Sequence, residues 1–542
     1  MSRPIAGQDV DHDVLIIGAG MSGMYQLHRL RALGLNVQVV EAGTGVGGTW
    51  YWNRYPGARF DSESYSYGYS WSAELLDDWD WSEHFAAQPE TLRYLNHVAD
   101  RFDLRRDIRF ETRVKRCTFD EEANRWLVEA EDGYSATCWL LITALGPLSA
   151  PAMPALDGID DFEGEWHHTG LWPHDPVPME GRRVGIIGTG ASGVQTIQEV
   201  AKTAGSLTVF QRNPNWCAPL NNSPIEPDEM HDIRGRYDEI FAQCRSTHGQ
   251  FLHGRDRRSA FDVSDEERLR TYEELYASPG FGIWIGSFKD TLVDAEANAL
   301  MSEFVANKIR ERVDDPDIAE RLIPTNHGFG TRRVPMETDY YEVYNQDNVQ
   351  LVDLRETPIE RITATGVETS DGHHEFDLLI YATGFDAVTG SFDRIEIRGT
   401  DGELLKDKWD RDLRTMLGVA VAGFPNMLTL VGPQNSSTFC NIPRCIEDNV
   451  DWMTELIEHM LANDHERIET TPEAEAWWAQ LAAEAGSMLL MDKVVSWLTG
   501  YNANVGRTER RYVSWAGGSP AYREHCATVA DNGYDGFVFD NA

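Results

Sequence analysis

Two glycine-rich turns in this sequence have the residue types needed to hold the phosphates of dinucleotides. The first follows the apolar residues 14–17 and reads Gly18-x-Gly20-x-x-Gly23 at the start of a helical stretch. Glycines permit a tight turn and let backbone N–H groups at a helix N-terminus approach a pyrophosphate closely. A second apolar stretch ends at Glu41, whose carboxylate can accept hydrogen bonds from ribose hydroxyls. This order of strand, glycines, helix, strand and acid predicts dinucleotide binding.

The second turn, Gly188-x-Gly190-x-x-Gly193, differs from the first at the position of the acid. In the first turn the acid lies 23 residues after the first glycine, and the same count from Gly188 leads to Gln211, which is followed by Arg212. A free ribose hydroxyl prefers a carboxylate, whereas a 2′-phosphate repels a carboxylate and pairs with arginine. The first turn is therefore predicted to bind FAD or NAD, and the second NADP(H). The alternative for Arg212 is a surface arginine without a ligand.

Two such turns in one chain suggest a flavin that takes hydride from NADPH. Flavin disulfide reductases share this plan, but they need a closely spaced pair of cysteines after the first turn, and residues 42–61 contain none. The seven cysteines, at positions 117, 138, 217, 244, 440, 445 and 526, are scattered, odd in number and form no CxxC pair. That distribution is typical of free thiols in a reducing cytosol.

A third stretch, FEGEWHHTGLWP at residues 162–173, places two histidines and several aromatic residues just before the second turn. The pair His167-His168 raises the question of a metal, but no third ligand lies at a suitable spacing, so no metal site is predicted. The other simple interpretation is a structural linker. The stretch also fits the pattern F-x-G-x-x-x-H-x-x-x-W followed by Pro or Asp, at Phe162, Gly164, His168, Trp172 and Pro173.

That pattern is the signature of the type I Baeyer–Villiger monooxygenases, and the chain resembles this family along nearly its whole length. A second family pattern, GxWxxxxYPGxxxD, is matched at residues 48–61. The ending Trp172-Pro173 favours the ketone branch, which includes phenylacetone, cyclohexanone and acetone monooxygenases, because relatives that oxidise amines and sulfides end this motif in Tyr. Further stretches that resemble the family are residues 142–151, 328–349, 377–386, 431–437 and 496–502, and the resemblance is weakest at 216–326.

Two residues depart from the family pattern near the expected NADPH site. Arg332 stands where relatives have a lysine, which keeps the charge but changes its geometry. Asn213 stands where relatives often have Thr or Ser. Both departures are compatible with NADPH and are expected to alter its affinity at most.

The resemblance implies a reaction and a set of site residues. FAD and NADPH are the implied cofactors, and one oxygen atom of O2 enters next to a ketone carbonyl, by way of a C4a-peroxyflavin, to give an ester or lactone. Arg333 is the implied active-site arginine, Asp61 its partner carboxylate, and His168 a coupling residue between the nucleotide domains. The cofactor-binding residues implied are Gly18, Gly20, Gly23, Glu41, Thr49, Trp50, Tyr51, Trp52, Arg59, Asp61, Tyr67, Val114 and Ile442 (an active-site wall) around FAD, and Gly188, Thr189, Gly190, Ala191, Ser192, Gly193, Arg212, Asn213, Arg332, Arg333 and Trp497 around NADPH.

Two other functions remain open at this point. One is a flavin monooxygenase that acts mainly on sulfides or amines. The other is a non-catalytic redox sensor that binds FAD and NADPH. Oxygen-dependent NADPH oxidation separates the sensor from both enzymes, and an ester product separates the ketone enzyme from the sulfide or amine enzyme.

The expected fold is α/β, with two Rossmann-like dinucleotide-binding domains of the flavin monooxygenase type and a helical insertion. Residues 144–146 (Ala-Leu-Gly) and 382–384 (Ala-Thr-Gly) are expected to mark two crossings between domains. The FAD domain is then residues 1–147 and 381–542, the NADP domain 148–215 and 327–380, and the insertion 216–326. In the insertion, four apolar side chains share one helical face and are expected in the core; they belong to Met301, Phe304, Val305 and Ile309. The resemblance implies that the insertion helps to enclose the substrate.

The composition limits the possible partners. The 542 residues include 88 acidic and 48 basic side chains, for a formal net charge of −40, which argues against nucleic acid and anionic membrane surfaces as partners. The polar, acidic N-terminus lacks the layout of a signal peptide, and no apolar run approaches the roughly 20 residues that span a bilayer. A cytoplasmic enzyme is expected, with a small ketone and O2 as its partners. The oligomeric state is open.

Overall fold

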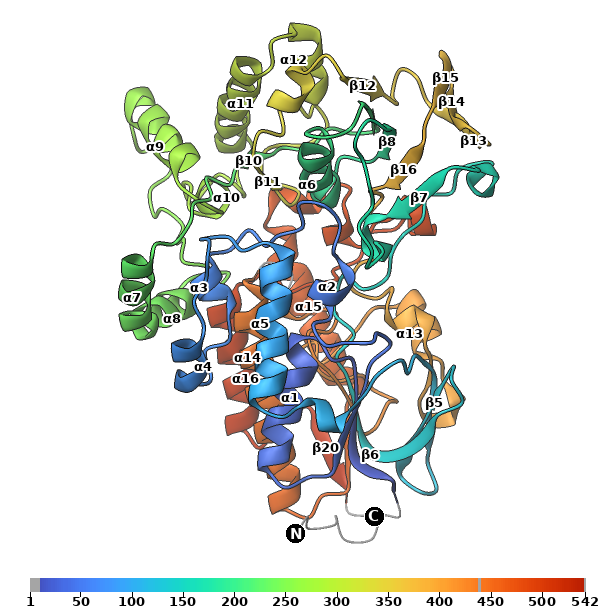
Figure 1. Cartoon of the computed structure of the whole chain (residues 1–542). Coiled ribbons are helices and arrows are strands. Elements are labelled where there is room, and N and C mark those ends of the chain that lie inside the picture. The colour runs from blue at the N-terminus through green and yellow to red at the C-terminus, as the bar shows by residue number, and fades with distance from the viewer. Residues whose placement is uncertain (1–9, 437–439, 541–542) are drawn as a thin grey trace.

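The computed structural model describes residues 10–436 and 440–540, and its two main sheets lie one above the other in Figure 1. The lower sheet has eight strands in the order β17-β4-β5-β6-β1-β2-β3, and β18 also pairs with β6. Strand β1 is parallel to its neighbours β2 and β6, whereas β4, β5 and β6 form an antiparallel meander. The strands are β1 (His12–Ile17), β2 (Val37–Val40), β3 (Ile108–Arg109), β4 (Val114–Asp120), β5 (Arg125–Ala130), β6 (Ser135–Thr143), β17 (Glu396–Arg398) and β18 (Met427–Thr429).

The upper sheet has five parallel strands in the order β12-β9-β8-β16-β7. Its central strands are short apolar runs that are almost wholly buried, as expected for parallel strands with both faces covered. A small antiparallel sheet, β13-β14-β15, lies beside it. The bounds are β7 (Glu165–His168), β8 (Arg183–Ile187), β9 (Ser206–Gln211), β12 (Val349–Asp353), β13 (Ile359–Thr363), β14 (Gly366–Thr369), β15 (Gly372–Glu375) and β16 (Leu378–Tyr381).

Helices from both ends of the chain cover the lower sheet. The first helix, α1, packs along α14, where the hydroxyl of Tyr25 donates to Asp451 over 2.7 Å and the amide of Gln26 donates to Thr454 over 3.1 Å. The upper sheet carries α6 (Ala191–Val200). The helices around the lower sheet are α1 (Met21–Ala32), α2 (Thr49–Trp52), α3 (Ser64–Tyr67), α4 (Ala73–Asp78), α5 (Gln88–Arg101), α13 (Leu405–Arg411), α14 (Ile442–Ala462), α15 (Pro472–Ser487) and α16 (Ser519–Asp531), with the hairpin β19 (Arg467–Thr470) and β20 (Phe537–Asp540).

A helical segment runs down one side of the molecule and touches both layers (Figure 1). The hydroxyl of Ser264 caps α9 by accepting the N–H of Glu267, and the predicted apolar face of α11 is buried at all four of its positions. Near the lower sheet, α8 contacts α3 and α16. The bounds are β10 (Ala218–Pro219), α7 (Pro227–Gly235), α8 (Tyr237–Ser246), α9 (Asp265–Ala277), α10 (Gly282–Ile285), α11 (Ala295–Arg312), α12 (Pro316–Leu322) and β11 (Met336–Glu337).

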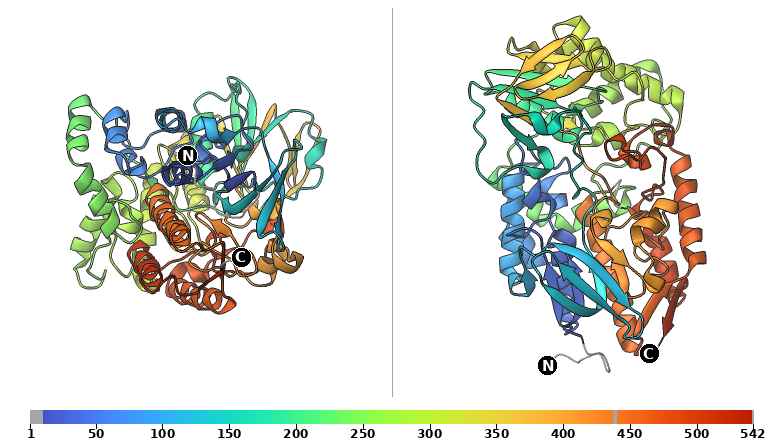
Figure 2. Two further views of the ribbon diagram at one scale, coloured as in Figure 1. Left: turned by 90° about the horizontal axis from the view of Figure 1, so that it is seen from below. Right: turned by 90° about the vertical axis from the view of Figure 1, so that its right-hand side faces the viewer.

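The chain crosses between the two sheets twice, and the two crossing segments lie side by side. The first crossing leaves β6 and leads to β7, and the second leaves β16 and leads to β17. The N–H of Ala152 donates to the carbonyl of Gly384 over 2.9 Å, and Pro151 pairs with Phe385 in an antiparallel bridge. The side view in Figure 2 shows the upper and lower layers that these segments join. The predicted α/β class, with its two nucleotide-binding sheets and helical insertion, is confirmed.

The cysteines differ from the expectation of seven free thiols. Cys440 and Cys445 form a disulfide, because the chain turns back between the loop before α14 and the first turn of that helix. The spacing is CxxxxC, which was excluded only for residues 42–61 after the first glycine turn, so this pair at the start of α14 was not predicted. The other five cysteines are free and buried.

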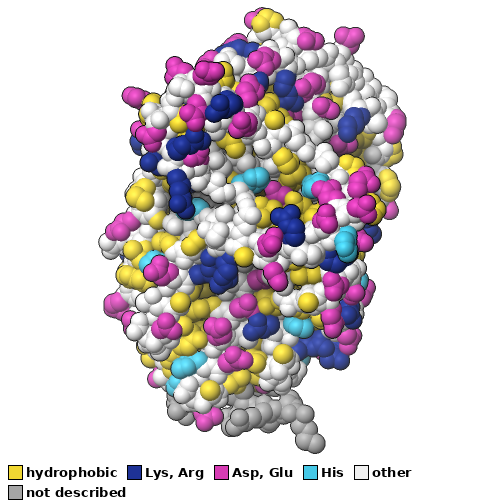
Figure 3. Space-filling model, turned by 90° about the vertical axis from the view of Figure 1, so that its left-hand side faces the viewer, with side chains coloured by type: hydrophobic (Ala, Val, Ile, Leu, Met, Phe, Trp, Pro, Cys, Tyr) yellow, Lys and Arg dark blue, Asp and Glu magenta, His cyan; other side chains and the backbone are white. Residues whose placement is uncertain are grey.

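The described surface shows how the excess of acidic groups is distributed. On the face in Figure 3, acidic and basic side chains are interspersed. Of the helices in residues 10–436 and 440–540, none combines the length and the apolar character that a membrane span requires.

Candidate functional site

The first glycine turn connects β1 to α1 and packs against the start of the first crossing. Gly18 has φ 109°, and a Cβ there would lie 2.5 Å from the carbonyl oxygen of Ala144, so only glycine fits. Helix α1 has no side-chain cap and no acidic residue in its first turn, so its N-terminal N–H groups are available to a phosphate. The carboxylate of Glu41 is buried and accepts the N–H groups of Ala19 and Gly43, each over 2.8 Å. A carboxylate has about four acceptor positions, so these two bonds fix Glu41 and leave room for ribose hydroxyls.

Some of the residues expected around the flavin ring lie beside this turn. The indole N–H of Trp50 donates to the hydroxyl of Tyr67 over 3.1 Å, and Tyr67 stacks on Phe60 with ring centroids 4.1 Å apart. A Cβ on Gly48, just before α2, would lie 2.8 Å from the Cα of Gly20, so α2 begins directly against the glycine turn. The hydroxyl groups of Tyr51 and Thr44 are hydrogen-bonded over 2.8 Å, and the guanidinium of Arg113 lies over the ring of Trp52. Val114 is buried at the start of β4. Arg59 already pairs with Glu83, at 3.1 Å.

The second glycine turn repeats this arrangement at the other crossing. Gly188 has φ 112°, and a Cβ there would lie 2.4 Å from the carbonyl oxygen of Ala382, the counterpart of Ala144. Around Gly190, by contrast, a Cβ would meet no atom within 4 Å, so the turn faces open space. The first turn of α6 again has neither a side-chain cap nor an acidic residue. Such a turn fits a pyrophosphate held by backbone N–H groups.

Two arginines without counter-ions lie near the second turn. Neither Arg212 nor Arg332 forms an ion pair with any carboxylate in the described part of the chain, and the Nε of Arg332 is buried without a hydrogen-bond partner. Desolvation, together with repulsion from Arg212, lowers the pKa of Arg332. The side chain of Gln211 turns away and donates to the carbonyl of Arg321 over 2.8 Å. A dianionic 2′-phosphate would satisfy both arginines, so this donor set fits NADP(H).

Three other residues predicted to contact NADPH, Thr189, Asn213 and Trp497, lie in segments that hydrogen bonds hold in place. The hydroxyl of Thr189 donates to the carbonyl of Asn213 over 3.0 Å, and the Asn213 side chain accepts a bond from Asn326 over 3.2 Å. Trp497 begins a short 3₁₀ turn (Trp497–Thr499) in a loop that is bound to the second crossing. In that loop, Asn502 donates to the carbonyl of Phe385 over 2.9 Å.

The structure brings Asp61 and Arg333 together although they are 272 residues apart. Arg333 Nη2 lies 2.7 Å from Asp61 Oδ2, and the Asp61 side chain is fully buried whereas that of Arg333 is 30% exposed. Burial raises the pKa of Asp61 in spite of the opposing effects of Arg333 and Arg59. Arg333 Nη1 is buried and has no hydrogen-bond partner among the described residues. One N–H of the guanidinium is thus tied to the carboxylate and another is available to an oxygen of a ligand.

A contact that the sequence did not predict links this pair to α6. The hydroxyl of Tyr55 donates to Gln195 Oε1 over 2.9 Å, and Gln195 Nε2 donates to the carbonyl of Arg59 over 3.1 Å. A Cβ on Gly57 would lie 2.4 Å from the carbonyl oxygen of Gln195. Residues 55–59, which lead to Asp61, therefore rest on the helix that starts at the second turn. Gln195 is only 3% exposed, and this burial, which the sequence does not show, is what marks the contact.

The signature stretch 162–173 lies across the two crossings. His168 is fully buried, its Nδ1 accepts the N–H of Gly170 over 3.0 Å, and its ring meets that of Phe385 edge-on at 6.2 Å. Desolvation lowers the pKa of His168 to about 4, so the ring is neutral at pH 7. A Cβ on Gly170 would lie 2.6 Å from the Phe385 ring and 3.1 Å from Pro151, so the chain passes tightly over both crossings.

The other signature residues anchor this stretch to the upper sheet. Phe162 packs with the apolar side chains on one face of that sheet, and a Cβ on Gly164 would lie 2.4 Å from its ring. Trp172 packs into the cluster on the other face. Adjacent residues of β7 point to opposite sides, and His167 binds Glu165 over 2.8 Å, so the two histidines do not converge on one point. No group of three metal-binding side chains occurs among the residues that the structure describes.

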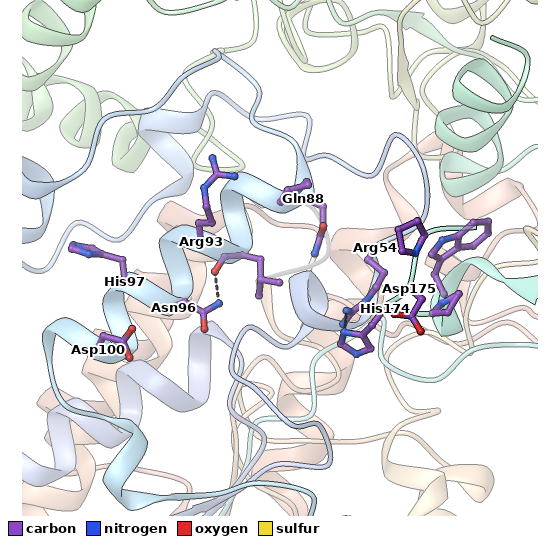
Figure 4. Close-up of a pocket in the computed structure, with 13 residues that line it drawn as sticks. Arg54, Gln88, Arg93, Asn96, His97, Asp100, His174 and Asp175 are labelled. Carbon is purple, nitrogen blue, oxygen red and sulfur yellow. Dashed lines mark hydrogen bonds between the residues drawn. The ribbon is translucent and has the colours of Figure 1, made fainter. Parts of the chain in front are cut away.

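A groove of about 760 Å³ opens where the signature stretch ends (Figure 4). Helix α5 forms one side of the groove and residues 172–176 form the other. In Figure 4 Arg54 and His174 point toward one another, and Arg54 also contacts the carbonyl of Tyr51 in α2. Arg54 thus connects α2 to the chain that leaves the signature stretch.

Comparisons with known proteins agree with this geometry. The sequence family described as pyridine nucleotide-disulphide oxidoreductase matches residues 15–298. The 2-oxo-Δ3-4,5,5-trimethylcyclopentenylacetyl-CoA monooxygenase of Pseudomonas putida is 48% identical over 97% of this chain and 98% of its own. The methyl acetate-forming acetone monooxygenase of Gordonia sp. (strain TY-5) is 43% identical over 97% of this chain and 98% of its own.

The fold also matches solved structures. A crystal structure of OTEMO in complex with FAD and NADP has a TM-score of 0.95 and 47% identity, and the match covers 98% of this chain and 100% of that one. The chain belongs to the Baeyer–Villiger monooxygenases, the flavoenzymes that use FAD and NADPH.

Proposed function

We propose that this enzyme inserts one oxygen atom of O2 next to the carbonyl of a ketone, and that Asp61 and Arg333 are the charged pair at the reaction centre. Bound FAD supplies the activated oxygen, and NADPH supplies the electrons that reduce the flavin. The observation that carries the assignment is the buried carboxylate 2.7 Å from a guanidinium that keeps one N–H group without a partner. The chain's own residues must then bind the two cofactors, exclude water and stabilise negative oxygen.

The role of Arg333 follows from where charge develops. Attack on a ketone carbonyl moves negative charge onto oxygen, and a guanidinium held in place before the reaction stabilises that charge without reorganisation. Asp61 fixes the orientation of the guanidinium and compensates its charge in a site from which water is excluded. A structural ion pair would also be buried, so the variants described below separate the two roles.

The cofactor contacts predicted from the sequence remain a proposal, which the geometry of the two glycine turns supports. The first turn, Glu41 and the aromatic group around Trp50 are proposed to hold FAD. The second turn, Arg212 and Arg332 are proposed to hold NADPH, with the Trp497 loop beside them. The remaining predicted contacts are proposed in the same two sets: Thr49, Tyr51, Trp52, Arg59, Asp61, Tyr67, Val114 and Ile442 for FAD, and Thr189, Ala191, Ser192, Asn213 and Arg333 for NADPH.

The division into domains is also a proposal. The FAD domain is residues 1–147 and 381–542, the NADP domain 148–215 and 327–380, and the insertion 216–326. The two separate sheets and the two crossings support these boundaries. A cytoplasmic location is proposed as well; the five free cysteines favour it, whereas the Cys440–Cys445 disulfide does not.

A panel of neutral ketones tests the function. NADPH and O2 consumption are recorded together with the mass of the product, which for an ester or lactone is that of the ketone plus one oxygen. Sulfides and amines in the same panel test the heteroatom alternative through S-oxide or N-oxide products. NADPH oxidation without any oxygenated product would refute the monooxygenase assignment.

Variants test the charged pair. Arg333→Ala should still allow NADPH to bleach the flavin absorbance, because hydride transfer does not require the guanidinium at the carbonyl. Its ester formation should fall by about two to three decades, the effect of losing ~3–4 kcal/mol of preorganised charge. Asp61→Ala should keep FAD but oxygenate poorly. Arg361→Ala, which breaks an exposed 2.7 Å ion pair with Asp161, is the control and should leave both steps unchanged. Normal ester yield in Arg333→Ala would refute the proposed role.

A further inference from the structure

The disulfide between Cys440 and Cys445 encloses a residue that is proposed to line the reaction site. Cys445 belongs to the first turn of α14, and Cys440 lies two residues before that helix begins at Ile442. Ile442, the predicted active-site wall, therefore lies inside the short loop that the disulfide closes. A cross-link of this kind restrains the chain between its two ends.

Hydrogen bonds hold this loop, residues 440–445, against segments on two sides of the site. The Asn441 side chain donates to the carbonyl and to the hydroxyl of Ser66, each over 3.1 Å, and Ser66 precedes the proposed flavin contact Tyr67 in α3. The N–H of Asn441 donates over 2.7 Å to the carbonyl of Gly249, in the part of the insertion that follows α8. A change in loop 440–445 would therefore reach both the flavin side and the insertion side.

Three buried polar side chains converge on the sulfur of Cys445. The hydroxyl of Ser436 lies 3.5 Å from it, and the amide nitrogen of Gln250 and the hydroxyl of Ser519 each lie 3.6 Å from it. These three side chains are 4%, 2% and 1% exposed. Hydrogen-bond donors stabilise a thiolate, and so does the N-terminal turn of α14, which has no acidic residue and no side-chain cap. The protein thus favours negative charge on this sulfur.

The two sulfurs differ in access and in their ability to leave. Cys440 is 6% exposed, whereas Cys445 is fully buried. An entering thiolate therefore attacks the sulfur of Cys440, and that of Cys445 leaves as the stabilised thiolate. A carboxylate on this side, Asp448, is already paired with Arg245 and Arg523, so little of its charge opposes the thiolate.

The other five cysteines lack these features. All of them are buried and free, and burial raises the pKa of each thiol, which makes it unreactive. They are Cys117, Cys138, Cys217, Cys244 and Cys526. In a cytoplasmic protein, the location proposed above, a disulfide is usually transient or redox-sensing.

We propose that the disulfide Cys440–Cys445 is a redox-active modification site that exchanges with small dithiols, and that its state controls how firmly loop 440–445 holds the ketone. A thiolate of the dithiol forms a bond to the sulfur of Cys440, and the Cys440–Cys445 bond breaks with its electron pair going to Cys445, which then takes a proton. The second thiol attacks the mixed disulfide and releases Cys440. The protein gains two electrons and two protons, and the dithiol becomes a cyclic disulfide. Only the effect on the ketone rests on the proposed function.

Counting thiols tests the exchange. Wild-type enzyme that is denatured without reductant should show five thiols, the number of its free cysteines. Folded holoenzyme that is incubated with dithiothreitol, separated from the reagent and then denatured should show seven. Oxidised glutathione should return the count to five. If the folded enzyme keeps five thiols under conditions that give seven in urea, the disulfide is purely structural; if seven are found before any treatment, the disulfide does not form. Either result overturns the inference.

Kinetics test the consequence for the ketone. With a ketone that the panel shows to be a substrate, reduction should raise KM about 2- to 12-fold, because a side chain that reduction frees must be ordered again on binding. The KM for NADPH should change little. Cys445→Ser should have the raised KM with or without dithiothreitol. Cys526→Ala, which removes a buried free thiol and keeps the disulfide, is the matched control and should respond to dithiothreitol as the wild type does.

The outcomes separate this inference from the proposed function. If no ketone yields an ester, the proposed function fails, and the thiol count still decides whether the disulfide exchanges. If esters form with the same KM before and after reduction, the disulfide does not control the site and the inference is overturned. A response of Cys445→Ser to dithiothreitol would place the effect on another group and would also overturn it.

Discussion

Replacing Arg332 by glutamine gives a sharp test of the predicted NADPH site. Arg332 is half-buried and unpaired, so its bond to a 2′-phosphate would be poorly screened by water. A charge-assisted hydrogen bond of this kind contributes about 1.5–3 kcal/mol, which corresponds to a loss of roughly 12- to 160-fold in kcat/KM for NADPH. Arg212 is exposed, where ion pairs contribute only about 0.2–1 kcal/mol, so Arg212→Gln should lose roughly fivefold at most.

The same substitution should have the opposite effect on the protein without nucleotide. Arg212 repels Arg332, and the protein desolvates Arg332 without offering a carboxylate. Removing that charge relieves both penalties, so the thermal midpoint of nucleotide-free Arg332→Gln should equal or exceed that of the wild type. Saturating NADP⁺ should then raise the midpoint less in the variant, because a tenfold weaker Kd removes about 1.4 kcal/mol of ligand-linked stabilisation.

The assay is steady-state kinetics with NADPH and NADH, paired with thermal unfolding with and without NADP⁺. Kinetics with NADH should be nearly unchanged in both variants, since NADH lacks the phosphate. Arg321→Gln is the matched control: it removes a nearby arginine whose guanidinium already pairs with Glu356 at 3.1 Å. An equal loss with NADPH and NADH, or a lower midpoint for nucleotide-free Arg332→Gln, would refute the assignment.

Four further outcomes are expected. Burial holds the pKa of His168 near 4, below its ordinary 6.5, so the unfolded chain takes up the proton first as pH falls. His168 should therefore lower the free energy of unfolding by about 2 kcal/mol between pH 7 and pH 5. Urea unfolding of His168→Gln should not show this loss. His168→Gln should also stay yellow, with FAD bound but turnover impaired, whereas a colourless protein would indicate a direct cofactor contact. Glu41→Ala should release FAD on gel filtration, because the turn loses the acceptor for Ala19 and Gly43 as well as for ribose. Gln195→Leu should slow the reduction of the flavin by NADPH more than it weakens NADPH binding, because it frees Tyr55 and the chain that leads to Asp61. If the variant binds NADPH and reduces its flavin as the wild type does, Gln195 does not couple α6 to Asp61.

The sequence predicted those parts of the site that depend on local chemistry. The glycine turns, the contrast between Glu41 and Arg212, and the signature stretch all follow from residue types at fixed spacings. The ion pair between Asp61 and Arg333 was accessible only through the resemblance, because 272 residues separate its members. Gln195 could not be assigned, since a glutamine within a helix carries no signal until its burial against Tyr55 is known.

The sequence also could not predict which charged side chains form ion pairs with each other. The lack of a counter-ion at the half-buried Arg332 is a property of three-dimensional packing in a chain rich in carboxylates. The same is true of Arg59, which was predicted at the cofactor but pairs with Glu83. The disulfide between Cys440 and Cys445 likewise depends on how the chain enters α14.

The two adjacent crossings have a mechanical consequence. Since the segments at Ala152 and Gly384 are hydrogen-bonded to each other, twisting one sheet relative to the other would shear that bond, whereas tilting about the line through both segments would preserve it. The crossings by themselves therefore oppose a twist more than a tilt, and buried His168 lies beside them. Gly18 rests on Ala144 at the start of one segment and Gly188 on Ala382 at the start of the other. Both nucleotide turns thus sit close to the pivot, where a given tilt displaces them least, and the largest excursions fall on the far ends of the two layers.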